Sequence, residues 1–309
     1  MRDRLMTTEP RLSMTESPLL RLNRLSLSRS FTPQVDIDWN AETTDEEFAA
    51  LYEAASLLVG SGRDGHLDQA ARARFARYQQ MNLMLFTALL ERHGIGVLAQ
   101  MYDQDDSQPF TEYLGNFLKE EIYHYTMFTR AIDKLQESMP GRPPLPALAL
   151  DRAMRCLFAG IKLLPSSRLR ANLAFTFFAF AEQLTIYIHQ LVHEQIPRQG
   201  GFVNQIWAFH ALEEARHLVF DRMMLEQNRL PRALAWLPRL IGGGLCALLA
   251  LLVNRNELWI ARQVGVPVRL WHLPRLIRTT QAPFKRRVFG LLGRILRGRW
   301  EVAGEGLSP

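Results

Sequence analysis

One eight-residue stretch, HALEEARH at positions 210–217, combines three side chains that can bind a metal ion. His210, Glu214 and His217 are separated by four and then by three residues. On a helix these three side chains fall within about 60° of one another around the axis. A single polar helix face has the same appearance, so a metal site requires further ligands elsewhere in the chain.

Further ligands of the right type occur in three other stretches. LKEEIYHY contains Glu121 and His124 at the same three-residue spacing, which places both on one helix face. Glu91 lies in the apolar stretch FTALLERHG and Glu182 in FFAFAEQLTIYI. A lone ionised carboxylate in such surroundings costs several kcal/mol unless it is paired or bound to a metal.

Together these residues form two similar halves, each with one glutamate followed about 30 residues later by a Glu-x-x-His pair. Two helices that give one Glu each, and two that give Glu-x-x-His, are typical of carboxylate-bridged dinuclear sites in helical bundles. Carboxylate and imidazole ligands suit iron or manganese. The predicted metal ligands are Glu91, Glu121, His124, Glu182, His210, Glu214 and His217.

Four neighbouring residues are weaker candidates. Glu120 and Glu213 directly precede ligand glutamates and point about 100° away, so we expect them to support the ligands or to lie at the surface. His189 lies on the same helix face as Glu182, but it is one or two helical turns away from the proposed site. His93 faces away from Glu91 and is interpreted as a capping or surface group.

Long helices must position these ligands. Apolar periodicity predicts helices over about 66–104, 111–138, 147–163, 168–195 and 202–228. Thr44 and Glu47 form a capping box that begins an earlier helix, and the chain beyond Pro231 is still helical by pattern but in shorter pieces. No run has the alternation of a strand. The fold class is therefore all-α, a bundle of four long helices with extra helices at both ends.

The organisation predicted along the chain has three parts. Residues 1–43 are expected to be an irregular arm, and residues 44–309 a single helical domain. Its metal-binding core covers about 65–230, and a basic helical extension covers 231–309. The two cysteines, Cys156 and Cys246, are not in a CxxC spacing, which disfavours a zinc–thiolate site or a disulfide framework.

The charge of +6 is concentrated at the C-terminal end, where residues 229–309 hold 14 arginines and lysines against three glutamates. Such a segment suits an acidic partner, a membrane surface or nucleic acid, but no nucleic-acid-binding motif accompanies it. The apolar run 240–253 has 14 residues with three glycines, too short to cross a bilayer. We therefore expect no transmembrane segment, no nucleic-acid partner and a cytoplasmic location.

At these ligand positions the sequence resembles the p-aminobenzoate N-oxygenase family of di-iron proteins, which have a ferritin-like fold. The family pattern is a Glu, then Asp/Glu-Glu-x-x-His, then a second Glu and His-x-x-Asp/Glu-Glu-Ala-Arg-His. Here EEIYH at 120–124 and HALEEARH at 210–217 follow Glu91 and Glu182 in that order. The resemblance covers roughly 65–230, and His210 separates this family from relatives with only two histidines.

The resemblance implies a ferritin-like, two-iron oxygenase that uses dioxygen to convert an amine nitrogen to hydroxylamine, with nitroso or nitro products as further steps. It also implies an external electron donor and a homodimer. Manganese or a mixed manganese–iron pair would use the same ligands. The basic extension suggests that the amine arrives on an acidic carrier protein, with Arg286, Arg287, Arg294 and Arg297 as docking residues; a solvated basic surface is the alternative.

Other functions share this ligand set. A C–H hydroxylase or desaturase would use the same site, and a ferritin-like iron-binding protein is a third interpretation. The amine itself is not specified. No arginine occupies the helix faces next to Glu91 and Glu182, so a less polar amine than an aminobenzoate is expected.

Overall fold

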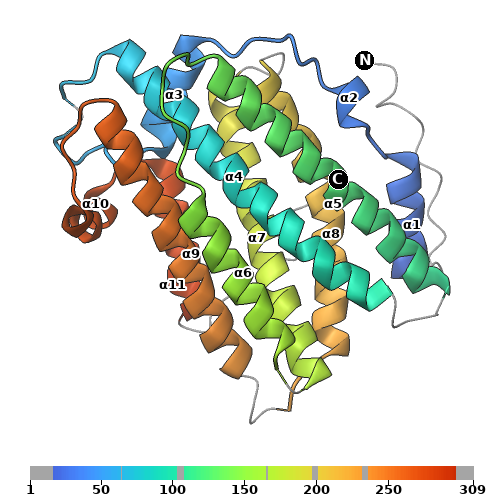
Figure 1. Ribbon diagram of the computed structural model, residues 1–309. Coiled ribbons are helices and arrows are strands. Elements are labelled where there is room, and N and C mark those ends of the chain that lie inside the picture. The colour runs from blue at the N-terminus through green and yellow to red at the C-terminus, as the bar shows by residue number, and fades with distance from the viewer. Residues whose placement is uncertain are drawn as a thin grey trace.

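The computed structural model consists of helices and connecting loops, without a strand in the residues that it describes, which are 17–63, 65–102, 108–164, 166–196, 201–231 and 236–296. Figure 1 shows the long helices lying side by side with shorter ones at the periphery. The α-helices are α1 (Pro18–Ser28), α2 (Pro33–Asp36), α3 (Asp45–Ala55), α4 (Gln69–Tyr102), α5 (Gln108–Glu137), α6 (Leu148–Lys162), α7 (Ser167–Gln195), α8 (Phe202–Gln227), α9 (Trp236–Gln263), α10 (Leu273–Thr279) and α11 (Pro283–Leu296).

Four of these helices, α4, α5, α7 and α8, make up the central bundle. The most extensive helix contacts are α4 with α5 and α7 with α8, so each predicted half of the site is a packed helical pair. The predicted ranges agree with the observed bounds to within three residues. The all-α bundle predicted from periodicity is confirmed.

Local sequence signals account for several of the helix starts. The Thr44 side chain accepts a hydrogen bond from the backbone N–H of Glu47, and the Glu47 carboxylate accepts one from the backbone N–H of Thr44. This reciprocal capping box satisfies two N–H groups that a helix start leaves free. Ser166 likewise accepts from the N–H of Leu169 at the start of α7.

The prediction that residues 1–43 lack regular structure is wrong for the described part of that segment, which contains α1 and α2. Ser17 caps α1 by accepting from the N–H of Leu20, and Pro18 occupies the first helical turn, where its missing N–H costs nothing. Leu22 is buried, and α1 packs mainly against α5. Residues 1–16 lie outside the described part.

The C-terminal helices also differ from the expectation of short pieces. Helix α9 has 28 residues and continues through the three glycines of the run GGG, packing against α4 and α7. Packing against neighbouring helices offsets the low helix propensity of glycine. The largest cluster of buried apolar side chains extends from Leu22 to Leu292, so both terminal additions share the core of the bundle.

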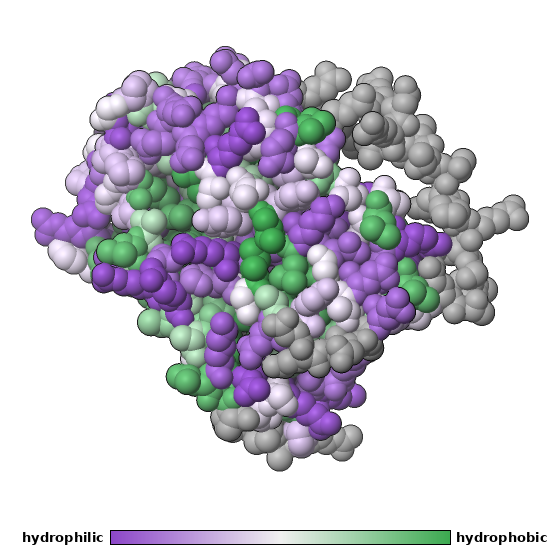
Figure 2. Space-filling view, turned by 45° about the vertical axis from the view of Figure 1, so that its right-hand side comes forward, coloured by the Kyte–Doolittle hydropathy of each residue, from purple (hydrophilic) through white to green (hydrophobic). Residues whose placement is uncertain are grey.

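One described helix, α7, is long and apolar enough to cross a membrane by composition. However, 78% of its most apolar window is buried inside the protein, as expected for the central helix of a bundle. Figure 2 shows one face of the molecule, on which hydrophilic residues predominate and hydrophobic ones form separate patches. No described helix is therefore a clear membrane span.

Candidate metal centre

The bundle brings the seven predicted ligands into its interior. Glu91 comes from α4, Glu121 and His124 from α5, and Glu182 from α7. The remaining three, His210, Glu214 and His217, come from α8. None of the seven is more than 7% exposed. Residues up to 126 positions apart in the chain therefore meet in one buried cluster.

The first half of the cluster is centred on His210. Its Nε2 lies 3.1 Å from Glu91 Oε1 and 2.8 Å from Glu214 Oε1. His124 Nδ1 lies 3.4 Å from the same Glu214 oxygen and 4.0 Å from Glu91 Oε1. Each of these four residues offers one ligand atom, and the four atoms lie within 4.8 Å of one another. One ion placed among them would meet two imidazoles and two carboxylates.

The second half is centred on His217. Its Nδ1 lies 3.1 Å from Glu121 Oε1 and 3.6 Å from Glu214 Oε2. His124 Nδ1 lies 3.9 Å from Glu121 Oε1. Glu121, His124, Glu214 and His217 form a second group with ligand atoms within 4.8 Å. Glu214 directs one oxygen to each half, which is the arrangement of a carboxylate that bridges two ions.

Glu182 belongs to neither group of four but lines the same cavity as Glu91, Glu121 and Glu214. Its Oε2 is buried and forms no hydrogen bond with the described residues. Burial, reinforced by the negative charges of Asp221 and Glu214, raises the pKa of Glu182 well above its usual range. A cation in the cavity would remove this penalty.

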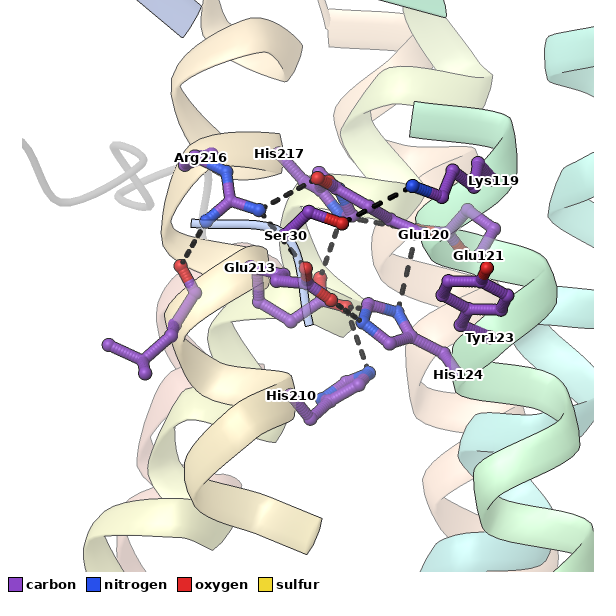
Figure 3. A network of polar contacts seen from close by, with 12 residues as sticks. Ser30, Lys119, Glu120, Glu121, Tyr123, His124, His210, Glu213, Arg216 and His217 are labelled. Atoms are coloured by element: carbon purple, nitrogen blue, oxygen red, sulfur yellow. Dashed lines mark hydrogen bonds and ion pairs between the residues drawn. The ribbon is translucent and has the colours of Figure 1, made fainter. Parts of the chain in front are cut away.

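The outer nitrogens of two histidines make crosswise hydrogen bonds between α5 and α8. His124 Nε2 donates to Glu213 Oε2 at 2.8 Å, and His217 Nε2 donates to Glu120 Oε2 at 2.8 Å. Each histidine of one helix thus binds the acid that precedes the ligand glutamate of the other (Figure 3). Both acids are buried, so the surface interpretation of Glu120 and Glu213 is wrong. Such bonds fix the tautomer and the ring orientation of a metal-binding histidine.

Arg216 joins the two acids and was not predicted. Its Nη2 donates to Glu120 Oε1 at 2.8 Å and to Glu213 Oε1 at 3.2 Å, and Figure 3 shows the guanidinium pointing toward both. Burial alone would raise the pKa of Glu120, but His217 and Arg216 lower it to about 2. The sequence signal for Arg216 was its place in EEARH, directly before His217.

Two further polar groups near the cluster were also missed. Asp221, one turn after His217 on α8, is fully buried, and burial, together with the negative charges of Glu214 and Glu121, raises its pKa well above its usual range. Tyr113 on α5 is fully buried as well, which raises the pKa of its hydroxyl. The i+4 spacing from His217 was the one signal available for Asp221.

The two weaker histidine candidates, His93 and His189, lie outside the ligand groups. His93 stacks on Phe158 and lies 3.5 Å from Asp151, while the His189 ring stacks on that of His193. Neither histidine is a member of the two ligand groups. Aromatic rings close the cluster instead: Phe117 stacks on His217 with ring centroids 3.7 Å apart.

The residues present fit two metal ions. The ligand set consists of imidazole and carboxylate only, which suits iron or manganese. Within the described residues, His124 Nδ1, His217 Nδ1 and Glu214 Oε1 are buried without a hydrogen-bond partner, like Glu182 Oε2. Buried polar atoms of this kind normally have partners. Bound cations would provide partners for these four atoms of the buried cluster.

Comparisons with known proteins agree with this site. Residues 13–272 match the family described as P-aminobenzoate N-oxygenase AurF, a longer stretch than the 65–230 over which a resemblance was expected. No curated protein sequence gives a significant match.

Solved structures with the same fold are R2-like oxidases. An R2-like ligand-binding oxidase with an aerobically reconstituted Mn/Fe cofactor has a TM-score of 0.53 at 14% identity, covering 94% of this chain and 98% of that chain. A substituted form of an R2-like ligand-binding oxidase, reconstituted anaerobically, has a TM-score of 0.50 at 14% identity, covering 91% and 93%. At these identities the likeness establishes the ferritin-like fold.

Proposed function

The chain belongs to the P-aminobenzoate N-oxygenase AurF family, and on this premise we propose that it oxidises an amine nitrogen with dioxygen at a di-iron centre. The coarser statement, that it is a di-metal oxidoreductase, follows from the family and the buried Glu/His cluster. The proposal that it oxidises nitrogen and uses iron rests on the family and on the arrangement of the residues in the cluster.

The observation that carries the proposal is the position of the third histidine. His210 is fully buried, and its Nε2 lies within 3.1 Å of carboxylate oxygens of Glu91 and Glu214. This is the histidine whose presence distinguishes the amine-oxidising family from relatives with two. We therefore assign all seven residues, Glu91, Glu121, His124, Glu182, His210, Glu214 and His217, as iron ligands.

The reaction proposed is the hydroxylation of a primary amine. R–NH₂, O₂, two electrons and two protons give R–NHOH and H₂O, so an external electron donor must supply both electrons. Two bound irons would supply the redox chemistry that activates dioxygen. The chain contributes fixed ligand positions, a cavity beside them, and aromatic rings that exclude water from the cluster.

The metal is proposed to be iron. The R2-like oxidases carry a Mn/Fe cofactor, as their descriptions state, and the ligand types of this chain also accept manganese. A mixed manganese–iron centre is therefore the alternative that metal analysis must address. The homodimeric state, the cytoplasmic location and a carrier-bound amine remain parts of the proposal.

Metal content and amine turnover test the proposal together. Protein loaded with ferrous iron should hold about two irons per chain, change its optical absorption when oxygen is added, and convert an arylamine to its hydroxylamine. Less than about one iron per chain, without an oxygen-dependent spectral change, would refute the di-iron centre. Oxidation at carbon with the amine unchanged would instead identify a C–H hydroxylase or desaturase.

Two variants separate the ligands of the two halves. His210 belongs to one group of four, whereas Glu214 belongs to both and directs one oxygen toward each. His210→Ala should therefore leave about one iron per chain, and Glu214→Ala should lose most of both. His189→Ala, which changes a histidine outside both groups, is the matched control and should retain the full iron content.

A further inference from the structure

The outer face of α9 carries a stripe of leucines and arginines, here called the α9 stripe. Its members are Leu248, Leu251, Arg255, Leu258 and Arg262. On an α-helix they fall within about 80° of one another around the axis and extend over about 21 Å. All of them except Leu258 are exposed. Other side chains of α9, such as Ile260, are buried, and the helix packs against α4 and α7. The α9 stripe is therefore what this helix presents to solvent.

The C-terminal end of the α9 stripe borders a hollow of about 420 Å³. The segment that follows α9 forms the other wall with Arg269, Leu270 and Trp271. Leu270 is 59% exposed and Trp271 67%, and the Arg269 guanidinium carbon lies 5.0 Å from the centre of the Trp271 ring. Figure 1 shows α9, α10 and α11 on one side of the bundle and α1 on the other. Three arginines and two large exposed apolar side chains thus surround one hollow.

The arginines at the hollow have no carboxylate partner among the described residues. The ion pairs in the described part of 236–296 are those of Lys285 with Glu257 and of Arg287 with Glu194. Since Glu257 is buried, no carboxylate of this segment offsets the exposed positive charges. Unpaired charges of one sign, gathered on one face, attract a surface of the opposite sign.

We infer that this face binds the surface of an anionic lipid bilayer, with a lipid phosphate in the hollow and Leu270 and Trp271 at the boundary of headgroups and acyl chains. Arginine binds phosphate oxygens through two parallel N–H bonds. Tryptophan concentrates at membrane–water interfaces, because its ring is apolar and its N–H is polar. Leu248 and Leu251 extend the apolar contact along α9. The contact is peripheral, and it does not depend on the reaction proposed above.

Positive charge alone would also suit an acidic protein, such as the carrier proposed for the amine. The composition of the face favours a bilayer. Protein interfaces include uncharged polar groups that hydrogen-bond across the contact, whereas the α9 stripe and the segment 269–271 contain only leucine, arginine and tryptophan. Arginine stems can lie along apolar lipid while their guanidinium groups stay among the headgroups. A line of leucine and arginine about 21 Å long matches an extended lipid surface.

Binding to vesicles of two compositions tests the inference. The full chain should float with vesicles of equal parts phosphatidylglycerol and phosphatidylcholine, and should float less as salt is added. It should not float with vesicles of phosphatidylcholine alone. Binding to neither kind of vesicle, or equal binding to both, would overturn the inference.

Removal of charge tests the role of the hollow. Arg255→Gln with Arg262→Gln should lower the affinity for the anionic vesicles by about 25-fold, since each arginine near an anionic surface contributes about fivefold. Arg21→Gln with Arg168→Gln removes the same charge at exposed positions of α1 and α7 and should change the affinity by less than about twofold. Equal losses in the two double variants would show that net charge, rather than this face, binds the vesicles.

Variants of Trp271 test the apolar part of the contact. Trp271→Ala should lower the affinity by about tenfold at every salt concentration, because salt does not screen an apolar contact. Leu163→Ala, which changes an 84% exposed side chain at the end of α6, is the matched control and should bind like the wild type. Brominated lipid should quench part of the tryptophan fluorescence, and Trp271→Phe should bind but lack this part. Identical quenching in both proteins would place Trp271 outside the bilayer.

Two further measurements separate the bilayer from other anionic partners. Inorganic phosphate, at concentrations that leave the ionic strength nearly unchanged, should not release the protein from the vesicles. Release would identify a soluble phosphate as the ligand and overturn the inference. Polyglutamate that binds more tightly than the anionic vesicles, and that loses its binding in Trp271→Ala, would instead identify an acidic protein as the partner.

Discussion

Two glutamates that are not assigned as ligands, Glu120 and Glu213, hold the histidines of the cluster in place. Each accepts a hydrogen bond from the histidine of the opposite helix at 2.8 Å, and Arg216 donates to both. The carboxylates orient the rings so that Nδ1 faces the metal side, and they increase the basicity of the imidazoles. Arg216 offsets the negative charge that this arrangement buries.

Glu120→Gln and Glu213→Gln should each weaken metal binding by about 10–100-fold while leaving the helices folded. An amide offers a weaker acceptor than a carboxylate and can present its NH₂ group to the ring. Metal titration measures the affinity, and circular dichroism measures whether the helices remain folded. Glu137→Gln, at an exposed position of α5, is the control. Metal affinities equal to that of the wild type would show that these bonds do not position the histidines.

The protonation of His217 makes metal binding depend on pH. Burial would lower its pKa, but Glu214, Glu120 and Glu121 raise it well above the ordinary value of 6.5. Because a metal ion binds the neutral imidazole, loading must release this proton. Affinity should therefore rise as the pH increases from about 6 to 8, with proton release into weakly buffered solution. Affinity that does not change over this range would contradict the assignment of His217 as a ligand.

At the level of helices, a buried polar network fixes the C-terminal additions to the bundle. Lys285 of α11 forms an ion pair with Glu257 of α9 and donates to Asn254 Oδ1 at 3.0 Å. Glu257 also accepts from Gln79 of α4 at 3.0 Å and from the N–H of Leu57 at 3.3 Å. The network connects α9 and α11 to α4 and to the loop after α3.

Lys285→Met should destabilise the protein by about 3–5 kcal/mol, because it leaves the Glu257 carboxylate buried without a cation. Adding Glu257→Gln should recover part of this loss. Urea unfolding measures both, and Arg286→Met, the exposed neighbour on α11, should cost less than about 0.5 kcal/mol. If Lys285→Met alone were as stable as the wild type, water would have to reach Glu257 or the ion pair would not form.

For the molecule as a whole, positive charge is concentrated in the C-terminal part of the chain. Residues 236–296 contain one acidic residue, Glu257, and it is buried against Lys285. All exposed charges in this segment are therefore positive. Arg255, Arg262 and Arg269 border a surface hollow together with the exposed Trp271. This surface is complementary to an acidic partner, as the carrier hypothesis requires.

Charge reversal tests that hypothesis. Arg286→Glu with Arg287→Glu should raise the KM for a carrier-bound amine by about tenfold at low salt and leave turnover of the free amine unchanged. Both side chains are exposed, although Arg287 lies 3.8 Å from Glu194. The Arg294 side chain and Arg297, also named from the sequence, lie outside the described residues. Unchanged kinetics with the carrier-bound amine would leave a solvated basic surface as the interpretation.

The sequence by itself determined the helices and the ligand types. Helical periodicity and the three-residue spacing of Glu121 and His124 are local properties, because residues three or four apart on a helix share a face whatever surrounds them. Predicted and observed bounds of the four long helices agree for this reason. The exception is α1, a helix of 11 residues that is stabilised by packing against α5.

Only the tertiary structure decided how the helices meet across the site. The pairing of His124 with Glu213 and of His217 with Glu120, and the position of Arg216 between the two acids, depend on the relative rotation of α5 and α8. The approach of Phe178 to Gly94 depends in the same way on α4 and α7. Packing of the whole core sets these rotations, so no local spacing encodes them.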